Sequence, residues 1–304
     1  MNHAVVIMSL LAAFHMVGPA TDSGLASEGV SNAYAEPDTA VKADTVNKGS
    51  ADDTSSAELP PPYTSFDDLR VIPNHAFSVG EKLKYDIHYG PIVAGSATIE
   101  IPSCIYYESR KCYKVEFSMR SAPFFDLFFK VRDYYYSLID VEGLFPWKFE
   151  QHIREGGYKK DFTAWFDQCN HTATTSQGGP YVIVPYTQDA VSSFFYARTL
   201  NYDTLKVGNE IHFSNFYENK VYPLDVRYLG RENVHTKAGN FHCQVIEPII
   251  VKGGLFKNTG KITIWITDDS LKVPVKVKTD VVIGSVVAEL VSYSGLAGVP
   301  TSKY

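Results

Sequence analysis

The stretch KLKYDIHY, residues 82–89, decides the fold class of this 304-residue chain. Its apolar side chains Leu83, Tyr85 and Ile87 fall on every second residue, with polar or charged side chains between them. A period of two predicts a strand with one face in the core and one face in water, as antiparallel sheets have. The fold class indicated is mainly β.

The same alternation recurs along the chain, for example in residues 113–120, 147–154 and 271–278. We count about a dozen candidate strands, separated by short turns such as Glu155-Gly156-Gly157. A sheet of that size cannot stay flat, because strand twist makes it curl or split. We therefore expect a single antiparallel β-roll or half-open barrel.

Two short helices are expected to interrupt the strands, at residues 122–129 and 188–199. In the first, Phe124, Leu127 and Phe128 share a face by their i, i+3, i+4 spacing, and Asp189 caps the second. We expect both helices to cover a concave apolar surface of the roll. A cavity of about 300 Å³ or more beneath them would suit a lipid-like ligand.

The chain divides into three predicted segments, 1–20, 21–66 and 67–304. Residues 4–17 are an apolar run that ends in Gly18-Pro19-Ala20, which predicts a cleavable signal peptide over 1–20 and an exported, periplasmic protein. The run is shorter than the roughly 20 residues that span a bilayer, so no transmembrane segment is expected in the mature chain.

Residues 21–66 hold eight acids, two bases and few large apolar side chains, which predicts a disordered acidic linker. The formal net charge of the chain is -6, and this linker accounts for all of it. Residues 67–304, the predicted β-roll domain, balance 26 acids against 26 bases. A neutral domain without a basic run excludes nucleic acid as an expected partner.

Four cysteines remain, Cys104, Cys112, Cys169 and Cys243, and no two form a C-x-x-C pair. If Cys104 and Cys112 stand opposite each other across a hairpin, a disulfide would close the loop between them. Free thiols fit the spacing equally well. The nine histidines are scattered, so neither a metal site nor a cofactor is expected.

Taken together, nine short motifs resemble the exported bacterial proteins grouped as domain of unknown function 3108. They lie in order from about residue 78 to 293: 80–85, 94–97, 155–158, 188–189 with Arg198, 229–232, 238–243, 264–269, 273–275 and 283–285. The resemblance implies a curled, barrel-like antiparallel β-roll with short helices. It implies no activity and no catalytic residues.

Enzyme motifs are absent from the sequence: it has no G-x-S-x-G, no H-E-x-x-H and no phosphate-binding glycine loop. Asp189 and Asp268 are the acids that a hydrolase with an unrecognised site could use. Each also has a structural interpretation, Asp189 as a helix cap and Asp268 as a turn former beside Asp269. No catalytic residue is assigned, and the sequence favours a non-enzymatic protein.

The binding candidates are Phe124, Phe128, Arg198 and Trp265. The two phenylalanines belong to the predicted apolar lid, and Arg198 either binds an anionic ligand or ties its helix to a strand. Trp265 either covers a second apolar layer or offers a surface on which a sugar stacks.

Three hypotheses for function remain. The first is an exported envelope protein that binds a hydrophobic or amphipathic envelope component, such as a lipid-like ligand. The second is a structural or assembly protein that binds another envelope protein. The third is a hydrolase with an unrecognised site.

Overall fold

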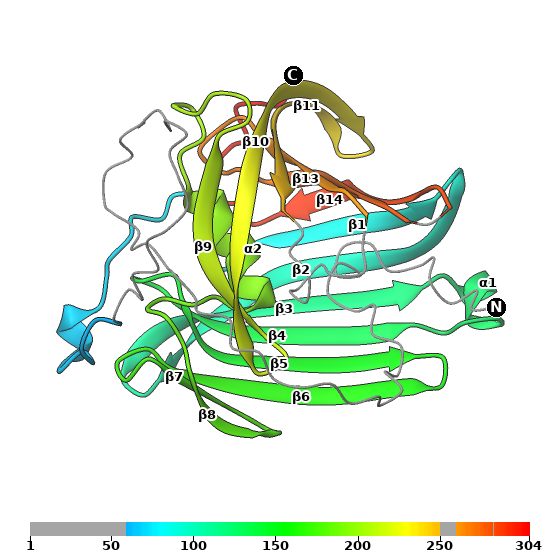
Figure 1. The fold of residues 1–304 in the computed structure, drawn as a ribbon. Coiled ribbons are helices and arrows are strands. Elements are labelled where there is room, and N and C mark those ends of the chain that lie inside the picture. Colours follow the sequence, from blue (N-terminus) through cyan, green and yellow to red (C-terminus); the bar gives the residue numbers. More distant parts are fainter. Residues whose placement is uncertain (1–58, 250–259, 282) are drawn as a thin grey trace, which may run out of the picture.

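A computed structural model describes residues 59–249, 260–281 and 283–304, which form one curled sheet (Figure 1). The signal peptide predicted over 1–20 and most of the predicted linker lie outside these residues. The sheet has fourteen antiparallel strands, so the expectation of a mainly β roll is confirmed. The strands are β1 (Lys82–Tyr89), β2 (Ile92–Tyr107), β3 (Arg110–Ser121), β4 (Arg132–Asp140), β5 (Pro146–Glu155), β6 (Tyr158–Asp167), β7 (Thr172–Thr175), β8 (Gly178–Val182), β9 (Glu210–Tyr217), β10 (Lys220–Thr236), β11 (Gly239–Pro248), β12 (Ile262–Thr267), β13 (Pro274–Asp280) and β14 (Ser285–Ser294).

Strand order explains how the sheet curls. The first eight strands run outward from β1 as a meander, and β9 to β14 return so that β14 pairs with β1. The order is therefore β8 to β1 followed by β14 to β9, which leaves β8 and β9 as the two edges. Among the described residues, no ladder joins these two edges and closes the sheet.

The two edges nevertheless meet at one end of the roll. The Gln188 backbone N–H donates to the Ser214 carbonyl at 2.8 Å, and the Phe216 backbone N–H donates to the Gln188 carbonyl at 2.8 Å. The Phe216 ring lies edge-on to Phe166 of β6 at 5.7 Å. These contacts hold β9 over the end of the meander, although the strands themselves do not pair.

The concave side of the sheet holds the main core. In β1, Leu83, Tyr85 and Ile87 are buried while the residues between them are more exposed, as the alternation predicted. Figure 1 shows helix α2 (Ala190–Thr199) enclosed between the long strands of the meander and the arching strands β9 and β10. The expectation that this helix covers the concave surface is confirmed.

The other helix contradicts the sequence-based expectation. Helix α1 (Pro123–Asp126) spans four residues in the connection between β3 and β4, at one end of the sheet (Figure 1). Phe124, Leu127 and Phe128 are 66%, 79% and 75% exposed. The expected burial of this apolar face is wrong, because the connection ends at the rim of the roll and not over its concave side.

A short 3₁₀ turn (Phe66–Asp68) packs on a second, smaller core cluster around Leu138 and Trp147. Phe66 packs edge-on against Trp147 at 5.6 Å, and the Tyr63 N–H donates to the Cys169 carbonyl at 2.9 Å. Residues 63–66, which the sequence analysis placed in the linker, thus contact the domain. Within the described residues, no helix has the length and apolar character needed to cross a membrane.

Candidate functional site: an apolar pocket beside helix α2

Asp189 fixes the start of helix α2. Its Oδ1 accepts hydrogen bonds from the backbone N–H groups of Val191 (2.6 Å) and Ser192 (2.7 Å), which the first helical turn leaves without partners. Its Oδ2 accepts the Ser137 hydroxyl of β4 at 2.7 Å. Burial raises the pKa of Asp189 to about 6, and these hydrogen bonds counteract the rise. The cap therefore also anchors the helix to the sheet.

Arg198 fixes the other end of the helix. Its guanidinium donates to both oxygens of Glu81, at 2.6 and 2.9 Å, and both side chains are about 1% exposed. Further hydrogen bonds reach the carbonyls of Ala76 (2.9 Å) and Leu271 (3.1 Å). The charge and most donors of Arg198 are thus already satisfied, so the tie between helix and strand is the role that the contacts support.

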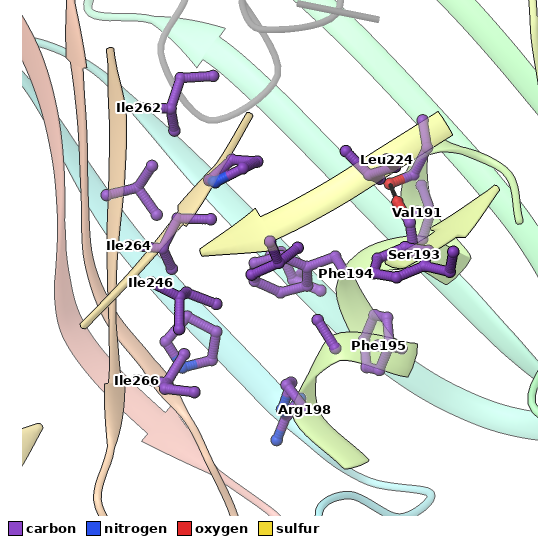
Figure 2. A pocket seen from close by; sticks show the side chains of 18 of the residues that line it. Val191, Ser193, Phe194, Phe195, Arg198, Leu224, Ile246, Ile262, Ile264 and Ile266 are labelled. Carbon is purple, nitrogen blue, oxygen red and sulfur yellow. Dashed lines mark hydrogen bonds between the residues drawn. The ribbon is translucent and has the colours of Figure 1, made fainter. Parts of the chain in front are cut away.

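A cavity of about 100 Å³ lies between α2 and the strands that arch over it (Figure 2). Figure 2 shows Val191, Phe194 and Phe195 of the helix on one side and Ile246, Ile262, Ile264 and Ile266 of the strands on the other. The remaining lining residues are Ile99, Phe117, Ala190, Ser193, Ala197, Arg198, Phe213, Leu224, Val226, Pro248, Pro274 and Val277.

The position of this pocket follows from the division of the core. Val191 and Val277 belong to the main core cluster, whereas Ile246 and Ile266 belong to a separate cluster around Tyr202. The pocket lies between the two clusters, and Phe213 and Ile264, which line it, pack against both. Phe194, Phe213 and Ile264 are only partly buried there.

The chemistry of the lining is almost entirely apolar. The Ser193 hydroxyl donates to the Ala190 carbonyl at 3.0 Å inside the helix, and Arg198 is neutralised by Glu81. Among the described residues, the lining includes no carboxylate, imidazole or thiol. A site of this kind can bind an apolar group, but it presents neither a general base nor a nucleophile to it.

The other binding candidates lie elsewhere. Trp265 faces away from the pocket, where its Nε1–H donates to Glu232 at 2.8 Å and the Lys276 ammonium lies 5.7 Å from its ring. Phe124 and Phe128 contact each other at α1, with ring centroids 5.6 Å apart. Of the four candidates, only Arg198 lines the pocket.

The two acids named for a hydrolase do not line this pocket, and both are held in hydrogen bonds within the protein. Asp189 caps α2, as described above. Asp268 accepts hydrogen bonds from Arg231 and Gln244, both at 2.7 Å. Its neighbour Asp269 accepts the backbone N–H of Leu271 at 3.1 Å, which is the bonding of a turn-forming aspartate.

Of the two alternatives for Cys104 and Cys112, the structure has the free thiols and not the disulfide. All four cysteines are free. The β2–β3 ladder pairs Cys104 with Tyr113 and Ile105 with Cys112, so the two sulfurs lie on opposite faces. The reason is the two-residue turn at 108–109: residues 104 and 112 can stand directly opposite only if the connecting loop has an odd number of residues.

Two acidic clusters were missed by the sequence analysis. Asp133 and Glu155 are buried side by side on the inward faces of β4 and β5, and burial raises both pKa values, that of Glu155 to about 8. Asp133 shares its strand face with Tyr135 and Ser137, so an acid at an inward position was the available signal.

Glu210, His212 and Asp225 form the second cluster, on the β9–β10 hairpin, with ligand atoms within 4.8 Å of one another. A carboxylate, an imidazole and a carboxylate at this spacing are a set of metal ligands. However, the Arg227 guanidinium already donates to Glu210 at 2.8 and 3.0 Å, and His212 Nδ1 bonds Asp225 at 2.7 Å. With a cation already in place, a second one would be disfavoured.

A family described as "Protein of unknown function (DUF3108)" matches residues 84–291. No curated protein matches the sequence.

Three solved structures resemble the fold. A β-barrel-like DUF1849 protein of Brucella abortus has a TM-score of 0.45 at 12% identity, over 74% of this chain and 98% of that one. A "putative exported protein with YmcC-like fold" of Bacteroides fragilis has a TM-score of 0.31 at 11% identity, covering 74% and 99%. A hypothetical protein of Chlamydia trachomatis has a TM-score of 0.31 at 8% identity, covering 73% and 91%. At these scores the likenesses carry no argument about function.

Proposed function

The chain belongs to the DUF3108 family of proteins of unknown function, and we propose that it is a non-enzymatic module that binds an apolar group beside helix α2. The observation that carries this proposal is the pocket between α2 and β9–β13, whose polar lining groups are already bonded within the protein.

The size of the pocket limits the ligand class. Pockets for drug-sized ligands measure roughly 300–1,000 Å³, and this one measures about 100 Å³. It accommodates the end of an acyl chain or a small ring, with the rest of the molecule leaving past Phe194, Phe213 and Ile264. The ligand we propose is therefore an amphipathic molecule of which one apolar end is buried.

Export remains part of the proposal. The apolar run 4–17 and the small residues after it support a signal peptide, and an exported protein would meet amphipathic envelope components. Intact-mass analysis of the protein recovered from its native host tests this. Loss of about the first 20 residues is the expected result, and a full-length product would contradict it.

Binding is tested by titrating a fluorescent fatty acid into the purified chain. We expect saturable binding, and we expect Ala197→Phe to abolish it because the new ring would occupy the pocket from the helix side. Ala297→Phe is the matched control, since Ala297 is exposed and does not line the pocket. Unsaturable binding, or equal loss in both variants, would remove the proposal.

A further inference from the structure

Helix α1 presents its apolar side chains to solvent in a fixed arrangement. Phe124, Leu127 and Phe128 are exposed, while Phe125 and Phe129 on the other side pack against the core. The Phe125 N–H donates to the Ala122 carbonyl at 2.9 Å, and the Phe129 N–H donates to Phe125 at 2.8 Å. Phe124, Leu127 and Phe128 are therefore kept in solvent by a segment that is itself hydrogen-bonded and packed against the core.

Other exposed apolar residues lie at the same end of the roll. The Ala122 N–H donates to the Ala94 carbonyl at 2.8 Å, which places α1 beside the start of β2, where Ile92 is 53% exposed. On the other side, the Gly156 N–H donates to the Lys130 carbonyl at 2.8 Å. This bond places the β5–β6 turn, with Tyr158 at 45% exposed, beside the chain that leaves α1.

We call this end of the molecule the α1 rim and define it by its exposed residues Ile92, Val93, Phe124, Leu127, Phe128, Lys130, Tyr158 and Lys159.

The charge of the α1 rim is positive. Lys130 and Lys159 are exposed, and neither forms an ion pair with a carboxylate in the part of the chain that the structure describes. The acid of α1, Asp126, is already paired with Arg132, whose guanidinium holds its pKa below the usual range. Two ammonium groups are thus left to meet an external anion.

We propose that the α1 rim docks the protein on an anionic lipid bilayer surface. Phe124, Leu127 and Phe128 would enter the boundary between headgroups and acyl chains, and Lys130 and Lys159 would bind lipid phosphates. Aromatic and aliphatic side chains flanked by lysines are the composition of interfacial anchors.

A bilayer fits the shape of the rim better than a folded partner does. The apolar residues belong to three separate segments, beside the β1–β2, β3–β4 and β5–β6 connections, which lie at the same end of the strands (Figure 1). No rim residue lines the pocket beside α2. A fluid surface can accept separate projections, whereas a protein partner would need a hollow shaped to each of them. The proposal does not depend on the apolar pocket.

The test is flotation of the chain without the predicted signal peptide, residues 21–304, with vesicles of phosphatidylcholine containing about one third phosphatidylglycerol. We expect the parent to float with these vesicles and to be released by high salt, because charge contributes to the attraction. In the double variant Phe124→Asp/Phe128→Asp, the bound fraction should fall on the order of tenfold or more. The double variant Lys130→Glu/Lys159→Glu should weaken binding to the anionic vesicles and leave binding to pure phosphatidylcholine unchanged.

Tyr106→Asp is the matched control, since Tyr106 is 74% exposed at the β2–β3 turn, the other end of β2. It should float as the parent does. Equal flotation of the parent and the phenylalanine variant would overturn the proposal, because the binding would then come from another part of the chain. A change of oligomeric state in the phenylalanine variant without a change in flotation would also overturn the proposal. The α1 rim would then be a contact between copies of this chain. Leu127→Ser replaces the double variant if that variant does not fold.

Discussion

Arg198 and Glu81, which are 117 residues apart in the chain, form a bidentate ion pair with both side chains about 1% exposed. The pair joins the last turn of α2 to the residue before β1. Arg198 is also part of the lining of the apolar pocket, whereas Glu81 is not. The position of α2, and with it the shape of the pocket, therefore depends on this contact.

Removing one partner of this pair should be strongly destabilising. Glu81→Ala leaves the Arg198 charge buried without its counterion, and we expect a loss of about 3–5 kcal/mol in the free energy of unfolding. Lys82→Ala is the matched control: its pair with Glu100 is 39% and 30% exposed and should contribute about 1 kcal/mol or less. Urea denaturation of both variants measures the difference, and similar losses would contradict the role assigned to Glu81.

The cap of α2 gives a second stability prediction. Asp189→Ala removes two bonds to helix N–H groups and leaves the buried Ser137 hydroxyl without its acceptor, so we expect a loss of about 2–4 kcal/mol. Ser65→Ala removes an exposed cap from the 3₁₀ turn and should cost well under half of that. Thermal or urea unfolding compares the two. If Asp189→Ala lowers the free energy of unfolding no more than Ser65→Ala does, the helix does not depend on its cap.

Glu155 should make the protein less stable as the pH rises. Its pKa is raised to about 8 in the fold by burial, with the neighbouring Asp133 carboxyl adding to the effect. The folded chain thus keeps a proton that the unfolded chain, with a glutamate pKa of about 4.3, has released. The free energy of unfolding should therefore fall between about pH 4.5 and 8.

The measurement for Glu155 is a series of urea titrations at pH 5, 6.5 and 8. In Glu155→Gln the decline should be smaller than in the parent. Asp189, whose pKa is also raised, contributes equally to both proteins, so the difference between them reports the Asp133–Glu155 pair. Identical pH profiles would show that Glu155 titrates normally.

Truncating a buried phenylalanine should lower the stability far more than truncating an exposed one. Phe195 is 1% exposed, and Phe195→Ala should cost about 3–5 kcal/mol through the cavity it leaves. Phe128 is 75% exposed, and Phe128→Ala should change the stability by about 0.5 kcal/mol or less. The denaturation midpoints of the two variants measure the difference. A large loss of stability in Phe128→Ala would contradict the exposed position of Phe128 and support the buried lid expected from the sequence.

Thiol accessibility should separate the cysteines into two pairs. Cys112 and Cys243 are fully buried, and burial raises the pKa of each to about 12, so both should resist alkylation in the folded chain. Cys104 and Cys169 are partly exposed and should react first. Peptide mapping without reduction gives the order of labelling, and a recovered Cys104–Cys112 disulfide would contradict the register of the β2–β3 hairpin.

The sequence by itself determined the fold class, because the side-chain period of a strand is a local property. Leu83, Tyr85 and Ile87 are buried as their spacing predicted, and Asp189 caps a helix where a cap was expected. The family was likewise identified correctly from short motifs in their order along the chain. None of these conclusions required knowing which segments meet in space.

Only the tertiary structure decided which faces are covered and which charges meet. The spacing of Phe124, Leu127 and Phe128 defines an apolar face but not what lies against it, and the connection that carries them ends at the rim of the sheet. The counterion of Arg198, Glu81, lies 117 residues away in the chain, and only the packing of α2 inside the curled sheet brings the two together. The pocket beside α2 has the same origin, because it is the space between two core clusters whose separation depends on how the whole sheet curls.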